Sequence, residues 1–159
     1  QVGIETGSTN LMEKHMKGKV KPFKPKEWYE LVVESHKTMH DNNWVPAETL
    51  IMGLPGEKAD DVQKTIDLIK DLSKYKSIIV PLYFVPIGNL GGKGFFRTKH
   101  NIPEHWQLLS ACIRHNLKWS YRITKDNPPP EMGSWKIWTL RRIINYIDKK
   151  IEKYLKLKD

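Results

Sequence analysis

Apolar and polar positions alternate in a way that predicts three strands separated by helices in the first part of the chain. Short apolar segments at residues 2–6, 47–52 and 78–85 are typical of strands, because each is brief and is bounded by glycine, proline or polar residues. Residues 78–85 are apolar at nearly every position, which predicts a strand that is buried on both faces. Apolar residues recur at helical spacing within residues 28–40 and 60–73.

Residues with special backbone preferences indicate where these elements begin and end. Asn10, followed three residues later by Glu13, predicts a capping box at the start of a short first helix, and Gly18 predicts its end. Pro25 is suited to the first position of the next helix. Pro81 lacks a backbone donor, so we expect a bulge or a local break in pairing inside the third strand.

The pattern changes after the third strand. A glycine-rich loop spans residues 88–99, a helix follows Pro103, and a run of prolines at residues 128–130 precedes a long final helix. The apolar positions expected to face inward on these two helices are Trp106, Leu109 and Ile113, and then Ile137, Leu140, Ile144, Ile147, Ile151 and Tyr154.

This order of elements predicts parallel strands joined by helical crossovers. The crossovers are about 30 to 40 residues long, which suits right-handed βαβ units. We expect an α/β fold, a partial TIM-type (β/α) barrel of about three parallel strands with flanking helices at residues 1–94, followed by a helical C-terminal extension at residues 95–159. A closed barrel of this type has eight strands, so we expect this chain to be part of a larger fold.

Charge and cysteine content narrow the function classes. The 159 residues carry 27 Lys and Arg against 18 Asp and Glu, a net charge of +9. A stand-alone basic α/β module that binds RNA is therefore an alternative, although the lysines are spread along expected helix faces, which favours solvated surfaces over a nucleic-acid patch. The single cysteine excludes an internal disulfide and fits a reducing, cytoplasmic environment. The sequence has no apolar run of bilayer-spanning length, so we expect no membrane partner.

Local motifs identify neither a catalytic nor a metal-binding residue. A phosphate-binding loop needs four residues between its glycines, whereas Gly88 and Gly92 have three between them. His36 and His40 have the spacing of metal ligands on a helix, but no third ligand accompanies them, and we interpret them as structural or exposed. Cys112 follows apolar residues at helical spacing, which indicates a buried core thiol and not a nucleophile.

Glycines and prolines cluster where each expected strand ends. The three strand-end segments are residues 5–8, 53–57 and 85–88. Ligands of open parallel sheets bind at the carboxyl ends of the strands, and small or rigid residues there let a ligand approach the backbone. The pattern predicts a ligand site where the three segments meet, without identifying the ligand.

Read in order, the same segments resemble parts of the radical S-adenosylmethionine enzymes, in the archaeal and bacterial branch that often carries an upstream cobalamin-binding domain. Residues 2–8 (VGIETGS) resemble the fourth strand of that family's barrel, residues 49–57 (TLIMGLPGE) the fifth, and residues 80–88 (VPLYFVPIG) the sixth. Residues 11–18 (LMEKHMKG) and 42–46 (NNWVP) continue the resemblance, which weakens after the glycine-rich loop.

This resemblance implies a set of residues that would contact S-adenosylmethionine. A carboxylate and a hydroxyl after the first strand would bond the ribose or the methionine end. A lysine would pair with the methionine carboxylate, although a solvent-facing role explains it equally well. Two residues of the second strand would line the adenine, and two after the third strand would close its other side. The carboxylate and the hydroxyl are those of Glu5 and Ser8, and the lysine is Lys17. The residues on the two sides of the adenine are Ile51 and Gly53, and then Val85 and Pro86.

The chain lacks one motif that is essential in this family. The three-cysteine motif that holds the 4Fe-4S cluster in this family is absent, and one cysteine cannot replace three thiolates. Because the chain starts inside a strand at Gln1, we expect its missing N-terminal half to be its partner, with the cluster in the full-length parent and cobalamin in an upstream domain. This part alone should bind S-adenosylmethionine weakly or not at all and be catalytically silent. Self-association through the open sheet edge is a further expectation.

Overall fold

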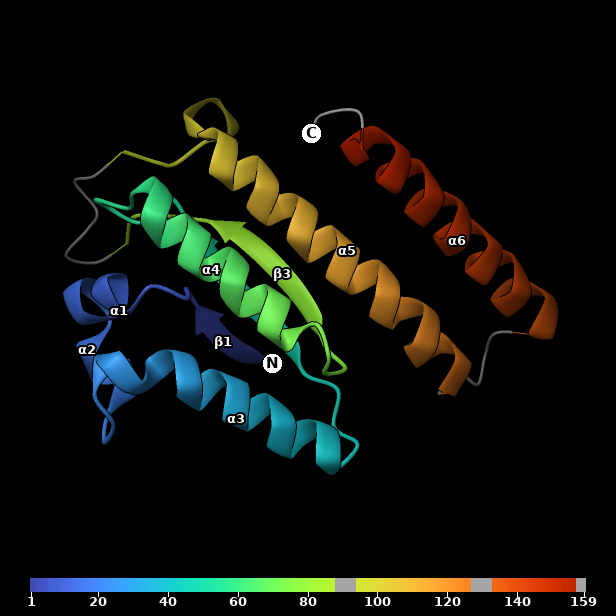
Figure 1. Ribbon diagram of the computed structural model, residues 1–159, viewed down its shortest axis with the longest axis horizontal. Coiled ribbons are helices and arrows are strands. Elements are labelled where there is room, and N and C mark those ends of the chain that lie inside the picture. Colours follow the sequence, from blue (N-terminus) through green and yellow to red (C-terminus); the bar gives the residue numbers. More distant parts are fainter. Residues whose placement is uncertain (88–93, 127–132, 157–159) are drawn as a thin grey trace.

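Three parallel strands form an open sheet in the computed structural model, which describes residues 1–87, 94–126 and 133–156 (Figure 1). The strands follow one another in sequence and in space, with the second strand in the centre: β1 (Val2–Glu5), β2 (Ala47–Met52) and β3 (Ile78–Tyr83). The α/β fold is confirmed, as are the parallel strands of a partial barrel, the flanking helices and the helical C-terminal part.

Helices cover one face of this sheet in the described part of the chain. Helices α3 and α4 lie on that face, α5 runs along β3, and α6 packs on the outer side of α5 (Figure 1). Two short helices, α1 and α2, connect β1 to α3 by way of a 3-10 turn at Pro25–Glu27. The helices are α1 (Thr9–His15), α2 (Lys17–Val20), α3 (Trp28–Asp41), α4 (Ala59–Leu72), α5 (Pro103–Asp126) and α6 (Ser134–Lys156).

The alternation of side chains along β2 decides which residues enter the core. Leu50 and Met52 point towards the helices and are buried, together with Ile4 of β1 and Ile79 of β3. Each such side chain stabilises the fold by about 1.5–3 kcal/mol relative to an exposed position. The helical spacing predicted within residues 60–73 is confirmed in α4, where the apolar residues at that spacing are buried: Val62, Ile66, Ile69 and Leu72.

The other face of the sheet carries side chains that none of the described helices covers. We call Thr49, Ile51, Val80 and Leu82 the uncovered sheet face; they lie side by side in the register of β2 and β3. Val80 is 40% exposed and Leu82 is 45% exposed. The prediction that the third strand is buried on both faces is therefore wrong. Successive strand residues point to opposite faces, and the described helices pack on only one of them.

The predicted bulge or break at Pro81 is also wrong. β2 and β3 stay in continuous register, and β3 lies at an edge of the sheet, where a proline can turn its nitrogen away from the neighbouring strand. Asn116 of α5 covers part of that edge, because its side-chain amide accepts from the Ile79 N–H and donates to the Ile79 carbonyl, both at 2.7 Å. The irregularity occurs instead in β1, where the register shifts between Gly3 and Glu5.

The first helix begins and ends differently from its prediction. Ser8, and not Asn10, is the N-cap of α1. Its hydroxyl oxygen accepts a hydrogen bond from the Leu11 N–H at 3.3 Å. The same hydroxyl donates to Asp61 of α4 at 2.5 Å, a long-range contact that orients it as a cap. Helix α1 ends before Gly18, which lies inside α2. The capping box and the helix end at Gly18 are thus corrected.

Helix α5 is present, but its inward face is rotated from the predicted one. Trp106 and Ile113 are exposed. Polar residues on the inward face obscured it in the sequence, because buried histidines interrupt the apolar pattern. Cys112 lies on this face, and burial raises its pKa to about 12, which confirms a buried core thiol. The buried residues of α5 are His105, Leu108, Cys112, His115 and Trp119.

Some predictions fall outside the described residues. They are the glycines within residues 88–93, the prolines at 128–130, and the side chains of Ile151 and Tyr154. The long final helix is confirmed as α6, whose Ile137, Leu140 and Ile144 are half-buried. Ile147 is exposed, so the prediction that it faces inward is wrong.

Within the described ranges, the structure has no helix that is long and apolar enough to cross a membrane.

Leu50 and Leu82 offer a matched test of the one-sided core. Leu50→Ala removes a fully buried side chain, and we expect the free energy of unfolding to fall by about 2–5 kcal/mol. Leu82→Ala removes a side chain of the uncovered sheet face and should change it by only about 0.5 kcal/mol. Urea unfolding followed by circular dichroism measures both. Equal losses would show that both faces of the sheet are packed.

Candidate ligand site at the carboxyl ends of the strands

The carboxyl ends of the three strands lie along one edge of the sheet. Glu5 ends β1, Gly53 follows β2 and Val85 lies just after β3. Because the strands are parallel neighbours, these residues share one rim, which confirms that the strand-end segments meet, except for Gly88, which is outside the described residues. Glu5 has a φ of 57°, an uncommon conformation for a residue other than glycine and one that occurs often at functional sites.

A pocket of about 310 Å³ opens at this rim beside Gly53. Gly53 has a φ of 80°, and a Cβ added there would meet the ring of Phe96 at 2.0 Å. Glycine is therefore required both for the turn of the backbone and for the approach of the ring. The walls of the pocket come from the turn after β2, the end of β3 and the residues before α5: Gly53, Pro55, Phe84, Gly94, Phe95, Phe96 and His100.

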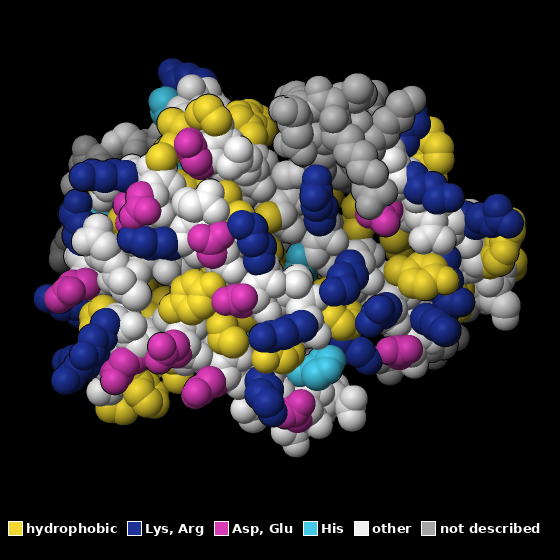
Figure 2. All heavy atoms as spheres, in the orientation of Figure 1, with side chains coloured by type: hydrophobic (Ala, Val, Ile, Leu, Met, Phe, Trp, Pro, Cys, Tyr) yellow, Lys and Arg dark blue, Asp and Glu magenta, His cyan; other side chains and the backbone are white. Residues whose placement is uncertain are grey.

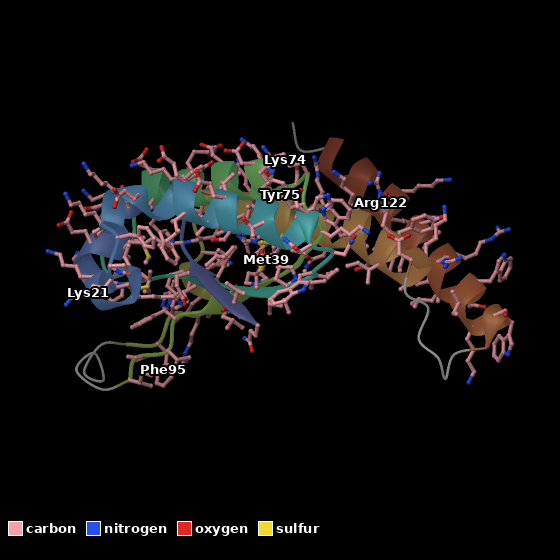
Figure 3. The ribbon with its side chains drawn as sticks, turned by 90° about the horizontal axis from the view of Figure 1, so that it is seen from below. Lys21, Met39, Lys74, Tyr75, Phe95 and Arg122 are labelled. Carbon is pink, nitrogen blue, oxygen red and sulfur yellow. The ribbon has the colours of Figure 1, made fainter. Side chains whose placement is uncertain are left out.

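Phe96 is at the centre of an aromatic group. Its ring centroid lies 5.6 Å from the rings of Tyr83 and His100, and 5.2 Å from the ring of His105. These separations are typical of favourable tilted and edge-to-face contacts. Phe95, its neighbour in the chain, is more than half exposed and lies on the side of the sheet away from α3 and α4 (Figure 3). The pocket therefore has one ring held by neighbours and one ring open to solvent.

The carboxylate of Glu57 holds the turn beneath this pocket. Its Oε2 accepts from the Gly53 N–H at 2.6 Å and from His105 Nε2 at 2.9 Å. His105 Nδ1 accepts from the Ile102 N–H at 3.2 Å, so Nε2 is the nitrogen that carries the hydrogen. Burial raises the pKa of Glu57 above its usual range, although the hydrogen bonds from His105 and Gly53 act in the opposite direction. Glu57 thus joins the turn after β2 to α5.

One of the predicted contact residues lines the pocket, and three others lie on or just after the two strands that end beside it. Gly53 forms its wall, and Ile51 is half-buried on the uncovered sheet face, where it packs against the same apolar cluster as Phe96. Val85 is exposed, and Pro86 after it is buried. The second and third strands therefore bring their predicted residues to one place.

The other three predicted contact residues form ion pairs or hydrogen bonds with other residues of the chain. Glu5 forms an ion pair with Lys19 of α2 at the end of β1. Lys17 is exposed and pairs with Glu13 at 3.3 Å, which agrees with a solvent-facing role. The Ser8 hydroxyl is fully buried, donates to Asp61 and accepts from a backbone N–H of α1. Ser8 is therefore a helix cap, and we leave it out of the ligand surface.

Sequence reasoning missed most of the pocket wall. The residues it missed follow β3 in the chain and reach the rim only because the segment before α5 folds back over Gly53. The contact of His105 with Glu57 joins residues 48 positions apart, and periodicity contains no signal for it. The adjacent phenylalanines in a glycine-rich segment were the available signal. The missed residues are Phe84, Phe95, Phe96, His100 and His105.

The residues present do not fit an iron–sulfur cluster. Among the described residues, no three His, Cys, Asp or Glu side chains are grouped so that they could hold a metal ion. A cluster of this kind needs several thiolate ligands, whereas Cys112 is the single cysteine of the sequence and burial keeps it as a thiol.

Comparison with known proteins yields no family: no protein-family model matches the chain, and no curated protein matches it at a significant level. The geometry of the rim is therefore the basis for assigning a function.

A second polar group is buried at the opposite end of the sheet. His36 donates from Nδ1 to the Val32 carbonyl at 2.6 Å and forms an ion pair with Glu48. Burial disfavours the charged form of His36. The hydrogen bond to Glu48 and the negative charge of Glu48 outweigh the effect of burial and raise the pKa of His36. His115 lies 2.8 Å from the Ser77 hydroxyl, and burial lowers its pKa to about 4. All of these groups are sealed in the core, which confirms the structural interpretation of His36.

Glu57→Ala should be strongly destabilising. The change leaves the Gly53 N–H and the buried His105 side chain without their acceptor, so we expect the free energy of unfolding to fall by about 3 kcal/mol. The control is Glu13→Ala, which removes an exposed carboxylate and should cost only about 0.5 kcal/mol. Thermal unfolding by calorimetry measures the difference, and similar losses in both variants would disprove the role of Glu57.

His115 makes the stability of the fold dependent on pH. Its folded-state pKa of about 4 lies below the ordinary value of 6.5, so the unfolded state binds more protons between these values. The contribution of His115 should therefore decrease as pH falls through this range, by about 3 kcal/mol at its lower end. His115→Gln should lose this component. Urea unfolding at several pH values tests it, and a variant with an unchanged pH slope would refute the assignment.

Proposed function

We propose that the rim of the sheet binds the adenosine part of S-adenosylmethionine and that the chain is one part of a radical S-adenosylmethionine enzyme. The observation that supports this best is the meeting of three strand-end segments beside an aromatic-lined pocket. They are the same segments whose sequence resembles that family. Adenine is a flat ring with apolar faces, and aromatic side chains offer it stacking surfaces.

In this proposal the adenine lies between Phe95 and the turn at Gly53. Phe95 is the exposed ring of the pocket, so it can stack on a ligand at little cost in lost internal contacts. His100 Nδ1 accepts from the Arg97 N–H at 3.0 Å, which leaves Nε2 as the nitrogen that carries the hydrogen. That N–H can donate to a ring nitrogen of adenine. Ile51 and Val85 supply apolar contacts from the sheet.

Glu5 is the residue that we assign to the ribose. It ends β1 on the same rim, and a carboxylate can accept from two neighbouring hydroxyl groups. Its ion pair with Lys19 orients the side chain at the end of the strand. Lys17 has an exposed partner of its own, so it contributes to this proposal only if that pair opens.

The uncovered sheet face fits the same proposal. It leaves apolar side chains of β2 and β3 exposed, and β1 is an edge strand. In the proposed parent, the N-terminal half of the barrel would cover this face and supply the cysteines of the 4Fe-4S cluster, and a cobalamin domain would lie further upstream. The chain alone would then provide the adenosine side of the site and no catalysis. Without that half, pairing of two copies through the β1 edge would hide the unpaired backbone groups.

Titration of the chain with S-adenosylmethionine, followed by backbone NMR shifts, tests the proposal. We expect weak binding, shifts confined to the rim, and competition by adenosine. Phe95→Ala should weaken binding by about tenfold, because stacking of a base on an aromatic side chain contributes about 1–3 kcal/mol. The exposed position of Phe95 means that this change should leave the fold intact.

The matched control is Trp44→Ala. Trp44 is an exposed aromatic residue that precedes β2, at the end of the sheet opposite the rim, so its loss should leave the affinity unchanged. Shifts outside the rim, or equal effects of the two variants, would overturn the assignment of the adenosine site.

A further inference from the structure

Helix α6 uses one side to pack on α5. Ile137, Leu140 and Ile144 are half-buried on that side, and Arg141 donates to the Thr124 carbonyl of α5 at 2.8 Å. Residues three and four apart lie on the same side of a helix, so the positions between these contacts form an opposite side that faces solvent. That side has no partner among the described residues.

The solvent side of α6 is rich in aromatic residues. Trp135 is 69% exposed, Trp138 is 58% exposed and Tyr146 is 62% exposed. Tryptophan and tyrosine are usually well buried, so three of them facing solvent on one helix mark an interaction surface. Ile143 adds an exposed aliphatic side chain to this surface. Ile147 is also exposed and lies at its edge, next to the stripe of Ile137, Leu140 and Ile144 that packs on α5.

Cations accompany each of these rings. Lys136 lies 5.8 Å from the ring centroid of Trp135, Arg142 lies 4.7 Å from that of Trp138, and Lys150 lies 5.6 Å from that of Tyr146. We call these six residues, together with Ile143, Ile147 and Lys149, the outer face of α6.

Acidic side chains are scarce around this face. Between Gly133 and Lys150 the sequence has one acidic residue, Asp148, which is half-buried. On α4, by contrast, Lys64 and Lys70 pair with aspartates of the same helix. Figure 2 shows the same difference: basic and acidic side chains mix over α3 and α4, while basic ones dominate over α5 and α6.

We propose that the outer face of α6 docks on an anionic lipid bilayer, with the helix axis parallel to the membrane surface. Tryptophan and tyrosine rings prefer the headgroup region of a bilayer, and lysine and arginine can extend from the same depth to lipid phosphates. A helix that combines these residues on one side binds by apolar burial together with attraction to anionic lipids. This departs from the expectation, based on hydropathy, of no membrane partner, and it is independent of the proposed cofactor site.

A lipid surface fits this face better than a nucleic acid does. Stacking with bases needs open ring faces, whereas each ring of the outer face has a cation of the chain beside it. Ile143 and Ile147 offer no stacking or hydrogen bonding to a base, but they gain from contact with hydrocarbon. The positive charge of the outer face complements the phosphates of a lipid bilayer and of a nucleic acid equally. The exposed aliphatic side chains favour the bilayer.

Flotation with vesicles tests the proposal on the full chain. We expect binding to phosphatidylcholine vesicles that contain about 30% phosphatidylglycerol, a blue shift of tryptophan emission, and loss of binding at high salt. The triple change Arg142→Gln, Lys149→Gln and Lys150→Gln should weaken binding about 100-fold, because each basic residue near such a surface contributes about 1 kcal/mol. The triple change Trp135→Ala, Trp138→Ala and Tyr146→Ala should abolish the blue shift.

Two control variants test whether binding depends on the outer face of α6 or on any exposed tryptophan or lysine of the chain. Trp44→Ala removes an equally exposed tryptophan outside α6, and Lys70→Gln removes an exposed lysine of α4; both should bind like the parent chain. Circular dichroism confirms that each variant is folded. The proposal is overturned if anionic and neutral vesicles bind equally, if the α6 variants bind like the parent, or if single-stranded RNA binds through the same residues while vesicles do not.

Discussion

The parallel pairing of β2 with a strand on each side is the interaction on which the rest of the structure depends. It brings the carboxyl ends of β1, β2 and β3 to one rim, because parallel neighbours end on the same side. It also divides the side chains of β2 between two faces. Leu50 and Met52 enter the core with the helices, while Thr49 and Ile51 remain on the uncovered sheet face. The pocket, the core and the exposed apolar face thus follow from one set of hydrogen bonds.

The turn after β2 links that pairing to the chemistry of the rim. Gly53 admits the Phe96 ring, and its N–H is held by Glu57, which in turn accepts from His105 of α5. One buried carboxylate therefore connects the central strand, the aromatic wall and a helix that arrives much later in the chain. Because the carboxylate is deeply buried, the whole arrangement depends on both of its donors being present.

The rim and the outer face of α6 are two separate surfaces of different character. The rim is concave, aromatic and built from several segments, whereas the outer face is one helix with alternating rings and cations. Periodicity predicted that the final helix exists and that Ile137, Leu140 and Ile144 face inward, but it wrongly placed the exposed Ile147 on the same side. It did not reveal that so many of the remaining positions carry exposed rings, since a tryptophan in a sequence is equally compatible with a core and with a surface.

The sequence alone determined the order and type of the elements, the parallel strands and the strand-end segments, because short apolar runs, helical spacing and turn residues act locally. It also placed Gly53 and Val85 after the ends of their strands. Only the tertiary structure decided that Ser8 caps α1 through Asp61, that Leu82 faces solvent, and that Phe96 and His105 reach the rim. These outcomes depend on which helices cover the sheet and on contacts between residues far apart in the chain, and neither is encoded in the spacing of neighbouring residues.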